Sequence, residues 1–228
     1  MSDPILCTRD GVVATVTINR PERRNAMNRN SWQRLGEIFE ELSQDSRLNC
    51  IVITGAGGKA FGSGNDISEF ATLRGDAEKV RAYNDITITA IRALENCRHP
   101  TIARIEGFCL GGGLEIALAC DIRLAAPNSI FGLPVKNMGI FLDPALADTL
   151  VNAIGRTAAL ELVLEGRFMD AKEAFERRLI TRIADDDCLD SEVAATVDRI
   201  CAGAPLAHRF NKEAIRKVRI EGDESEEQ

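Results

Sequence analysis

The stretch TIARIEGFCLGGGLEIALACDIRLAA, residues 101–126, carries the pattern that decides the fold. Residues 101–107 are mostly apolar and partly β-branched, which predicts a buried strand. Three glycines then open an apolar segment that predicts a helix over 111–119, and residues 121–126 predict a second strand. A strand, a helix and a strand in direct succession indicate an α/β fold with a buried sheet.

The residues before this stretch begin with a predicted hairpin and a helix. Apolar and β-branched runs over 5–8 and 12–18 are separated by the turn signal Asp10-Gly11, which predicts a β-hairpin. Ser31 then stands where it can cap a helix. The apolar face of that helix would be made by Trp32, Leu35, Ile38, Phe39 and Leu42.

A second strand and helix lie between this helix and the deciding stretch. The run CIVIT over 50–54 is continuously apolar, which predicts a strand covered on both faces. Apolar residues at helical spacing over 76–96 predict a helix that ends at the break His99-Pro100. The order of elements is therefore strand, helix, strand, helix, strand.

From Pro144 onward the pattern is almost wholly helical, so we expect a helical cap there rather than more sheet. The expected division is a core with the binding site over 1–143, a helical region over 144–219 and a disordered acidic tail over 220–228. The last eight residues, EGDESEEQ, contain five acids and no apolar residue. The helices are expected near 145–154, 157–164, 170–177, 190–201 and 206–219.

Composition excludes several classes of protein. The chain has 228 residues, and 28 basic against 35 acidic residues give a net charge of −7, which disfavours binding to nucleic acid or anionic lipid. No apolar run approaches the roughly 20 residues of a membrane span, and the start MSDPILCTRD lacks the layout of a secretory signal. We therefore expect a cytoplasmic protein without a nucleic-acid or membrane partner.

The cysteines and histidines bear on the cellular compartment and on metal binding. The seven cysteines form no CxxC pair, so most are expected to be small buried apolar residues in a reducing compartment. The only two histidines, His99 and His208, leave little scope for a zinc site or a histidine-based triad. No metal is expected.

The first candidate site is the loop GAGGKAFGSGND, residues 55–66, which follows the strand over 50–54. Loops at the carboxyl ends of strands bind ligands in open α/β folds. The loop lacks GxGxxG, it lacks the P-loop pattern because Ala60 follows Gly58-Lys59, and it contains no G-x-S-x-G. Its small residues can expose amides near 62–64 to a ligand oxygen; a flexible turn is the alternative.

The second candidate site is Gly111-Gly112-Gly113-Leu114-Glu115 at the start of the predicted helix. Glycines inside a helix cost about 1 kcal/mol each relative to alanine, so something should compensate. Free amides at this helix terminus can bind a developing oxyanion, and tight packing of the helix against a strand is the alternative.

Glu115 is the acid that this helix presents. It precedes the apolar run IALAC, which indicates a buried helix. A buried carboxyl is either hydrogen-bonded or has a raised pKa, and a raised pKa near neutrality suits general acid/base catalysis. The alternative is an acid that simply interacts favourably with the helix dipole. With two glycine loops, the chain offers the parts of a two-donor oxyanion hole.

Five motifs in order resemble the crotonase superfamily, the enoyl-CoA hydratases and isomerases, from about residue 5 to residue 219. The motifs are NRPERRNAMN (19–28), ITGAGGKAFGSGNDI (53–67), ARIEGFCLGGGLEIALACDIRLAA (103–126), FGLPVKNMGI (131–140) and RLITRI (178–183). The resemblance implies an α/β spiral of repeated ββα units followed by helices that mediate trimer formation. Family members continue past NKEAIRKV (211–218), where this sequence enters its acidic end.

The resemblance also implies a substrate and its contacts. Substrates would be acyl-CoA thioesters, with no cofactor beyond the CoA group, and the assembly a homotrimer or a dimer of trimers. The amides of Gly62 and Gly112 would form the oxyanion hole. CoA contacts would come from Arg24, Asn25, Ala26, Ala60, Gly62, Ser63, Gly64, Asn65, Asp66 and Gly112. Five arginines and a single acid over 20–34 suit the CoA phosphates, with a solvated basic face as the alternative.

The sequence departs from the hydratase pattern at one position. Glu115 matches one of the two glutamates of hydratases, but Val135 stands where the other would be, and valine cannot transfer a proton. Asp143 matches an aspartate that functions in dienoyl-CoA isomerases and chlorobenzoyl-CoA dehalogenases of the family. The alternative for Asp143 is an N-cap ahead of Pro144.

Three hypotheses follow. The leading one is an enzyme of the enoyl-CoA hydratase/isomerase type that stabilises a thioester enolate, with Glu115 and Asp143 moving protons. The second keeps the oxyanion hole but changes the reaction to dienoyl-CoA isomerisation, decarboxylation, hydrolysis or dehalogenation. The third is a noncatalytic acyl-CoA binder.

Overall fold

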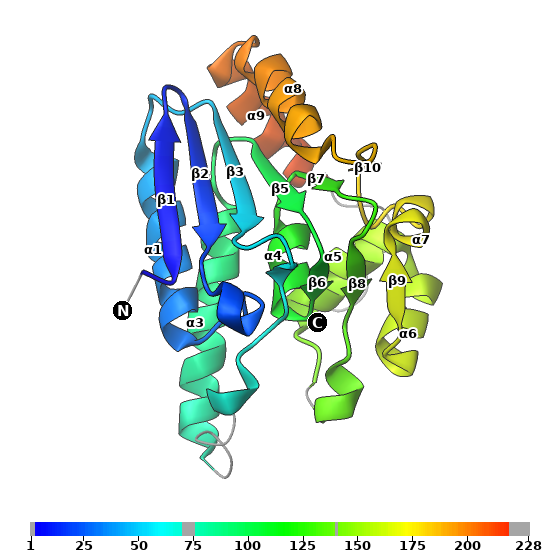
Figure 1. The fold of residues 1–228 in the computed structure, drawn as a ribbon. Helices are drawn as coiled ribbons and strands as arrows, with labels where there is room; N and C mark the ends of the chain where they lie inside the picture. Colours follow the sequence, from blue (N-terminus) through cyan, green and yellow to red (C-terminus); the bar gives the residue numbers. More distant parts are fainter. Residues whose placement is uncertain (1–2, 70–75, 140, 219–228) are drawn as a thin grey trace.

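The strands of the chain divide between two sheets, which the ribbon shows side by side (Figure 1). The structure is a computed structural model that describes residues 3–69, 76–139 and 141–218. The six-stranded sheet has the order β1 (Ile5–Asp10), β2 (Val13–Ile18), β3 (Cys50–Gly55), β5 (Thr101–Ile105), β7 (Ile122–Ala125) and β10 (Arg182–Ile183). The four-stranded sheet has the order β4 (Ala60–Gly62), β6 (Phe108–Leu110), β8 (Ile130–Gly132) and β9 (Phe168–Asp170).

The chain winds as a spiral in which each turn adds one strand to each sheet and then a helix. The turns are β3, β4 and α3 (Ala77–Glu95), then β5, β6 and α4 (Gly112–Ala119), then β7, β8 and α5 (Pro144–Ile154). The pairs β2/β3, β3/β5 and β5/β7 are parallel, because each strand returns through a helix. The expected α/β spiral of ββα units is confirmed.

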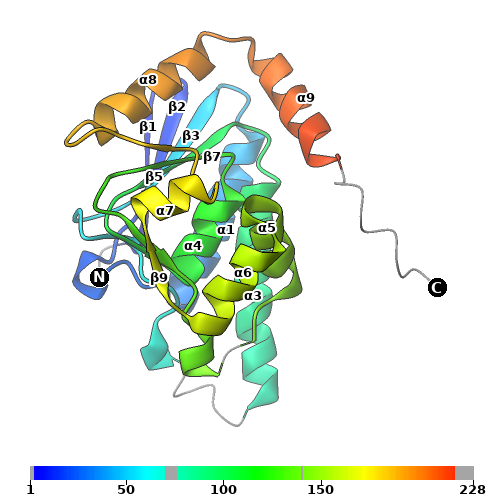
Figure 2. The ribbon, with the colours of Figure 1, turned by 90° about the vertical axis from the view of Figure 1, so that its right-hand side faces the viewer.

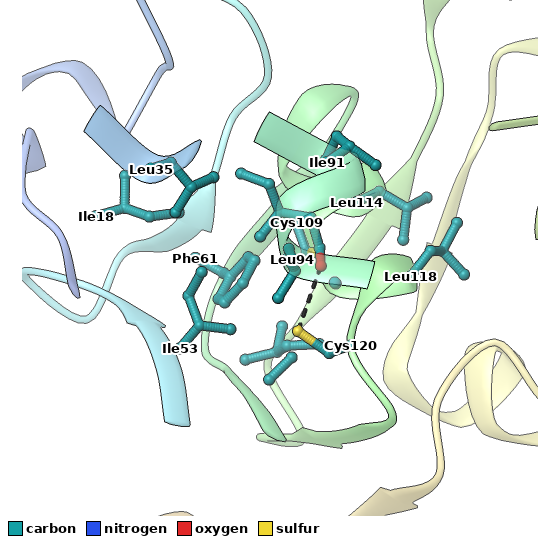
Figure 3. Close-up of a cluster of buried hydrophobic side chains, with 14 of the residues drawn as sticks. Ile18, Leu35, Ile53, Phe61, Ile91, Leu94, Cys109, Leu114, Leu118 and Cys120 are labelled. Carbon is teal, nitrogen blue, oxygen red and sulfur yellow. Dashed lines mark hydrogen bonds between the residues drawn. The ribbon is translucent and has the colours of Figure 1, made fainter. Parts of the chain in front are cut away.

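The helices α1 (Arg29–Gln44), α3 and α4 bury the main core against the sheets. Figure 3 shows part of this core, to which α1 contributes Leu35, β4 contributes Phe61 and α4 contributes Leu114. Leu35, Phe61 and Leu114 are all 0 to 1% exposed. The main core therefore fixes the start of α4 against the end of β4.

The predicted strand over 50–54 is covered on both faces, as its apolar run indicates. Ile51 and Ile53 join the main core, whereas Cys50 and Val52 join a second cluster on the opposite face of the sheet. That second cluster is closed by Leu189 and other residues of α8 (Leu189–Cys201). The alternation of side chains along a strand explains this division.

The C-terminal region contains the predicted helices, with two additions. It comprises α5, α6 (Arg156–Glu165), α7 (Ala171–Glu176), α8 and α9 (Pro205–Arg216). The expectation of helices rather than more sheet is wrong for β9 and β10, which pair with the edge strands β8 and β7. Both are two or three residues long, too short to show a periodic pattern.

Helix α9 lies apart from the two sheets and beyond α8, as the turned view shows (Figure 2). It has no buried residue, and polar contacts tie it to the body. Arg209 donates to the carbonyl oxygens of Ser46 and Leu48, and Lys212 pairs with Asp121 at 2.7 Å. Its apolar side chains therefore remain exposed in a single chain.

Three local predictions need correction or completion. The N-cap of α1 is Asn28 rather than Ser31, because the Asn28 side chain accepts a hydrogen bond from the Ser31 amide at 2.8 Å. The strands β4, β6 and β8 were not predicted from their short sequences. The predicted acidic tail over 220–228 lies outside the described residues, and within the described residues no helix is long and apolar enough to cross a membrane.

Candidate active site

The two glycine loops meet backbone to backbone where β4 ends and α4 begins. A methyl group added at Gly113 would lie 2.2 Å from the carbonyl oxygen of Gly62, and one added at Gly62 would lie 3.0 Å from Cα of Gly113. The ladder between β4 and β6 has an irregular register at Ala60/Gly62. The glycines are thus needed for the close approach of the two backbones, as the packing alternative holds.

Helix α4 begins without a side-chain cap. Its N-cap residue is Gly111, which has a left-handed φ of 51° and no side chain to bond the first-turn amides. The amide of Gly111 itself donates to Gly132 at 2.9 Å, and the amide of Glu115 donates to the Gly111 carbonyl. The amides at Gly112 and Gly113 therefore stand at the positive end of the helix dipole with no capping oxygen among the described side chains.

A tryptophan fixes the position of Gly112. A methyl group at Gly112 would lie 2.8 Å from Cζ2 of Trp32, so the indole ring packs directly on this glycine. The indole Nε1 donates a hydrogen bond of 2.8 Å to Oδ1 of Asn65. The loop after β4 and the start of α4 are thereby tied to the same side chain of α1.

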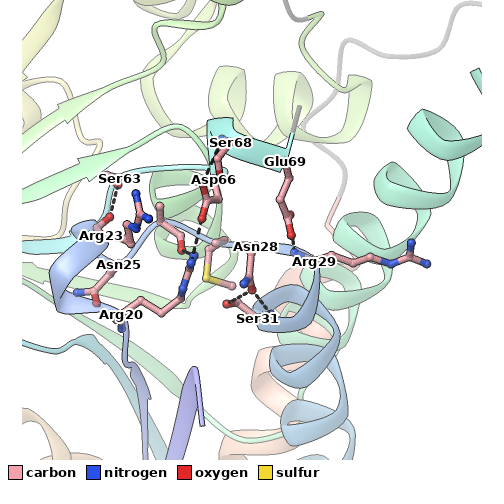
Figure 4. A network of polar contacts seen from close by, with 12 residues as sticks. Arg20, Arg23, Asn25, Asn28, Arg29, Ser31, Ser63, Asp66, Ser68 and Glu69 are labelled. Carbon is pink, nitrogen blue, oxygen red and sulfur yellow. Dashed lines mark hydrogen bonds and ion pairs between the residues drawn. The ribbon is translucent and has the colours of Figure 1, made fainter. Parts of the chain in front are cut away.

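The loop over 62–66 is held by a polar network that Figure 4 shows. The Arg20 guanidinium pairs with Asp66 at 2.9 Å, and both side chains are largely buried, with exposures of 16% and 12%. Arg20 also donates to the carbonyl oxygen of Ala26. The hydroxyl of Ser68 and Arg20 together hold the pKa of Asp66 below its usual value. Asp66 thus acts as an anchor of the loop.

The side chain of Asn25 is part of this support and points away from solvent. It is fully buried, it accepts a hydrogen bond from the Arg20 amide, and it donates to the carbonyl oxygens of Ala56 and Ala60. Of the residues expected to contact CoA, Asn25 and Ala60 therefore have buried side chains. Within the segment 24–26, Arg24 is exposed and Ala26 is half-buried, so a ligand contact there would come from these two residues or from the backbone.

Only some of the arginines in the segment 20–34 are available to a ligand, because others are engaged in ion pairs. Arg20 is engaged with Asp66, and Arg34 lies within ion-pair distance of three acids. Arg23, Arg24 and Arg29 are exposed, and the Arg24 guanidinium lies 5.3 Å from the centre of the Phe108 ring. The exposed cations suit a phosphate ligand at this edge.

Glu115 and Asp143 line one small pocket of about 40 Å³ beside the start of α4. The structure therefore brings together the two carboxyl groups singled out in the sequence. The pocket is closed by α3 and by the first turns of α5. Its other lining residues are Ile88, Ile91, Arg92, Glu95, Ala145, Leu146 and Thr149.

The pKa of Glu115 is raised to about 7. Burial is the largest cause, and the nearby carboxylates of Asp143 and Glu95 add to it. The positive end of the helix dipole acts in the opposite direction, so desolvation outweighs it here. A carboxyl with a pKa near neutrality can both give and take a proton at physiological pH.

Asp143 caps a helix, as the alternative interpretation of the sequence holds, and it also lines the pocket of Glu115. It is the N-cap of α5, with Oδ1 accepting from the Ala145 amide at 2.9 Å and Pro144 at the first helical position. One carboxyl oxygen is thus committed to the helix. Val135 opens the short helix η2 (Val135–Met138) and is not among the residues that line the pocket.

The pocket also contains two charged residues that the sequence analysis did not single out, Arg92 and Glu95. They lie on α3 at positions one turn apart, with Ile88 and Ile91 on the same face. The spacing in the sequence could have placed them on one helix face. Only the packing of α3 against α4 shows that this face meets Glu115.

Comparison with known proteins shows what the chain as a whole resembles. Residues 8–227 match the model of the family described as enoyl-CoA hydratase/isomerase. The chain is 46% identical to an enoyl-CoA hydratase/carnithine racemase from Magnetospirillum magneticum of known structure, with a TM-score of 0.92 over 95% of this chain and 81% of that one.

Two curated relatives show the range of reactions in the family. The short-chain-enoyl-CoA hydratase of Clostridium acetobutylicum is 32% identical over 93% of this chain and 81% of its own length. The mitochondrial Delta(3,5)-Delta(2,4)-dienoyl-CoA isomerase of Mus musculus is 34% identical over 88% of this chain and 64% of its own length.

Proposed function

Because this chain belongs to the enoyl-CoA hydratase/isomerase family, we propose that it acts on an acyl-CoA thioester whose carbonyl oxygen is bound by the amides of Gly62 and Gly112. The observation that carries the proposal is the position of Glu115. Its carboxyl has a pKa near 7 and lies in the same first turn of α4 as the uncapped glycine amides. A proton carrier and a potential oxyanion site thus occupy one helix turn.

The chemistry follows from these groups. When a proton leaves C2 of a 3-enoyl thioester, negative charge develops on the thioester oxygen, and preorganised amides stabilise it. Glu115 takes this proton and returns it to C4, so the double bond moves from C3–C4 to C2–C3 without net gain or loss of atoms. One carboxyl group suffices for this transfer.

Hydration makes a further demand. The oxygen of water adds to C3 of a 2-enoyl thioester, one proton of that water leaves, and a proton arrives at C2. Glu115 can supply one of these transfers, and Val135 cannot supply the other. Asp143 faces the same pocket and is the group that would complete the pair.

The second candidate reaction is isomerisation of a dienoyl-CoA. It is favoured by Asp143, which lines the pocket together with Glu115, and by the similarity to the mouse Delta(3,5)-Delta(2,4)-dienoyl-CoA isomerase. In this reaction Glu115 and Asp143 would remove and return a proton at opposite ends of a conjugated system. Decarboxylation, hydrolysis and dehalogenation share the oxyanion hole but have no further observation in their favour.

A mass-spectrometric turnover screen tests the proposal. Purified protein is incubated with crotonyl-, longer 2-enoyl-, 3-enoyl-, 3,5-dienoyl- and aromatic acyl-CoA, and Asp143→Asn runs beside the wild type. Conversion of 2-enoyl or 3-enoyl thioesters supports the leading reaction, and conversion of the dienoyl substrate alone, lost in Asp143→Asn, supports the second. Binding of every thioester without turnover would overturn both and leave a noncatalytic acyl-CoA binder.

The surroundings of the site support two further parts of the proposal. Helix α9 exposes Leu206, Phe210 and Ile215, each more than 60% exposed, which favours assembly with further copies into the homotrimer or dimer of trimers that the family resemblance implies. All seven cysteines are free thiols and four are buried, which favours a reducing compartment such as the cytoplasm.

A further inference from the structure

A basic cleft lies between α9 and the segment that follows α3. Its volume is about 620 Å³, and it shares no lining residue with the pocket of Glu115. It is lined by five cations and one acid, although the whole chain has a net charge of −7. The cations are Arg98, Arg209, Lys212, Arg216 and Lys217, and the acid is Glu213. Such a cleft attracts anions.

Three of these cations are not neutralised by a neighbouring acid. Each of the two lysines pairs with a carboxylate, at 2.7 Å and 2.6 Å, and the second of these pairs uses the acid of the cleft. In contrast, no carboxylate among the described residues lies within 4.0 Å of Arg98, Arg209 or Arg216. Their printed hydrogen bonds go to neutral carbonyl and amide oxygens. Each guanidinium has five N–H donors, so donors remain for a further ligand.

The arginines of the cleft are incompletely satisfied where water does not reach them. The Nε atoms of Arg98 and Arg209 are buried and have no hydrogen-bond partner among the described residues. Both arginines also act on the fully buried His99, because burial and, after it, the charges of Arg209 and Arg98 lower the pKa of His99 to about 4. Two positive charges from distant parts of the chain thus meet at one place, and an acidic ligand would relieve their repulsion.

The sequence that follows α9 has the opposite charge. EGDESEEQ, residues 221–228, contains five acids, and only four residues separate it from Arg216, the last residue of α9. The ten residues 219–228 reach about 33 Å when extended, whereas α9 with its 12 residues is about 18 Å long. The acidic segment is therefore long enough to return along α9 and to meet every cation of the cleft.

We propose that the acidic segment 221–228 binds in the basic cleft of its own chain, where its carboxylates pair with the guanidinium groups of Arg98, Arg209 and Arg216. Carboxylate and guanidinium groups match in shape and form charge-assisted hydrogen bonds. The short connection gives an effective concentration on the order of millimolar, so weak individual pairs suffice. The bound segment ties α9 to the end of α3, and this role does not depend on the proposed reaction.

Cross-linking with a carbodiimide tests the inference, because this reagent joins a carboxylate and an amine that are in contact. Arg98→Lys keeps the charge of the cleft and places an amine in it. Trypsin cleaves after Arg219 and releases the acidic segment as one peptide, so mass spectrometry identifies what it is joined to. The amine introduced by Arg98→Lys should be joined to residues 221–227 in low salt. The yield should fall in 1 M NaCl, where the Debye length is about 3 Å.

Controls separate binding in the cleft from random contact. Lys172, an exposed lysine of α7, should give no cross-link to the segment. In the Arg98→Lys background, Arg216→Gln should lower the yield by a factor of up to about 5, as expected for the loss of one exposed ion pair. Arg81→Gln, which removes a charge from the exposed surface of α3, should leave the yield unchanged.

Two results would overturn the inference. One is a yield at the amine introduced by Arg98→Lys that is no higher than the yield at Lys172. The other is a cross-link between differently labelled chains in protein refolded from a mixture of ¹⁴N and ¹⁵N chains, which would assign the cleft to a neighbouring copy. Neither measurement requires turnover of a thioester, so failure of the proposed function leaves this test intact.

Discussion

Asp143 combines two roles at the scale of a single residue, and they can be separated. Its Oδ1 caps α5, and its carboxyl faces Glu115 across the pocket. Asparagine is about as good an N-cap as aspartate, but it carries no charge. Asp143→Asn should therefore leave the free energy of unfolding unchanged while it lowers the pKa of Glu115.

Asp143→Ala should differ from this by the loss of the cap. The free energy of unfolding should fall by about 1 kcal/mol, measured by urea denaturation. Equal stability of the alanine and asparagine variants would show that the hydrogen bond to the Ala145 amide contributes nothing.

A second prediction at the scale of single residues concerns Trp32. Its ring packs on Gly112 and its Nε1 bonds to Asn65 at 2.8 Å. Trp32→Phe keeps most of the packing but leaves the partly buried Asn65 oxygen without its donor, so the unfolding free energy should fall by about 1 to 3 kcal/mol. The check is to measure by denaturation how much unfolding free energy Trp32→Phe costs in the wild type and how much it costs in a chain that already carries Asn65→Ala. An equal cost in these two backgrounds would contradict the assigned hydrogen bond.

The residues of the site were only partly predictable from the sequence. Glu115 was predictable because glycines before it and apolar residues after it indicate a buried helix start. Glu95 was not, because its contact with Glu115 is a tertiary contact between α3 and α4. The raised pKa of Glu115 likewise depends on neighbours twenty or more residues away in the chain.

At the scale of elements, the ion pair of Arg20 and Asp66 joins the segment after β2 to the loop after β4. The pKa of Asp66 is lowered in the folded chain, so its charged form favours folding. The stability it contributes is fully present above its ordinary pKa of 3.8 and is lost as the pH falls through the lower folded value.

Asp66→Asn should thus be less stable than the wild type at neutral pH, and the difference in unfolding free energy should shrink as the pH falls below about 4. Urea denaturation of both proteins from pH 7 down to acid pH measures this. A difference that stays constant across the range would show that the charge of Asp66 is not what holds the loop.

Elements were predictable in proportion to their length. Helix α3 and strand β3 match their predicted ranges closely, because their apolar residues repeat at regular spacing, whereas α1 has the predicted apolar face but begins at Arg29, ahead of the predicted cap Ser31. The strands β4, β6, β8 and β9 have three residues each, and they form only because neighbouring turns of the spiral bring them together. A whole sheet was therefore invisible to local patterns and entered only through the family resemblance.

At the scale of the whole molecule, the exposed apolar side chains of α9 predict that the chain assembles with further copies of itself. A homotrimer of chains of 24.9 kDa each, or a dimer of such trimers, is expected in solution, and its mass can be measured by sedimentation equilibrium. Phe210→Glu should dissociate it, because Phe210 is 69% exposed in the single chain. Val12→Glu, at the exposed turn of the hairpin, is the matched control and should leave the mass unchanged. A monomeric wild type at micromolar concentration would contradict this assembly.

The most direct test of the central claim is the rate of Glu115→Gln on whichever acyl-CoA the wild type converts. Glutamine keeps the shape of the side chain but cannot carry a proton, so kcat should fall by about 10² to 10⁴ while the Kd of the thioester changes little. Retained turnover in this variant would show that Glu115 does not carry the proton and would contradict the account.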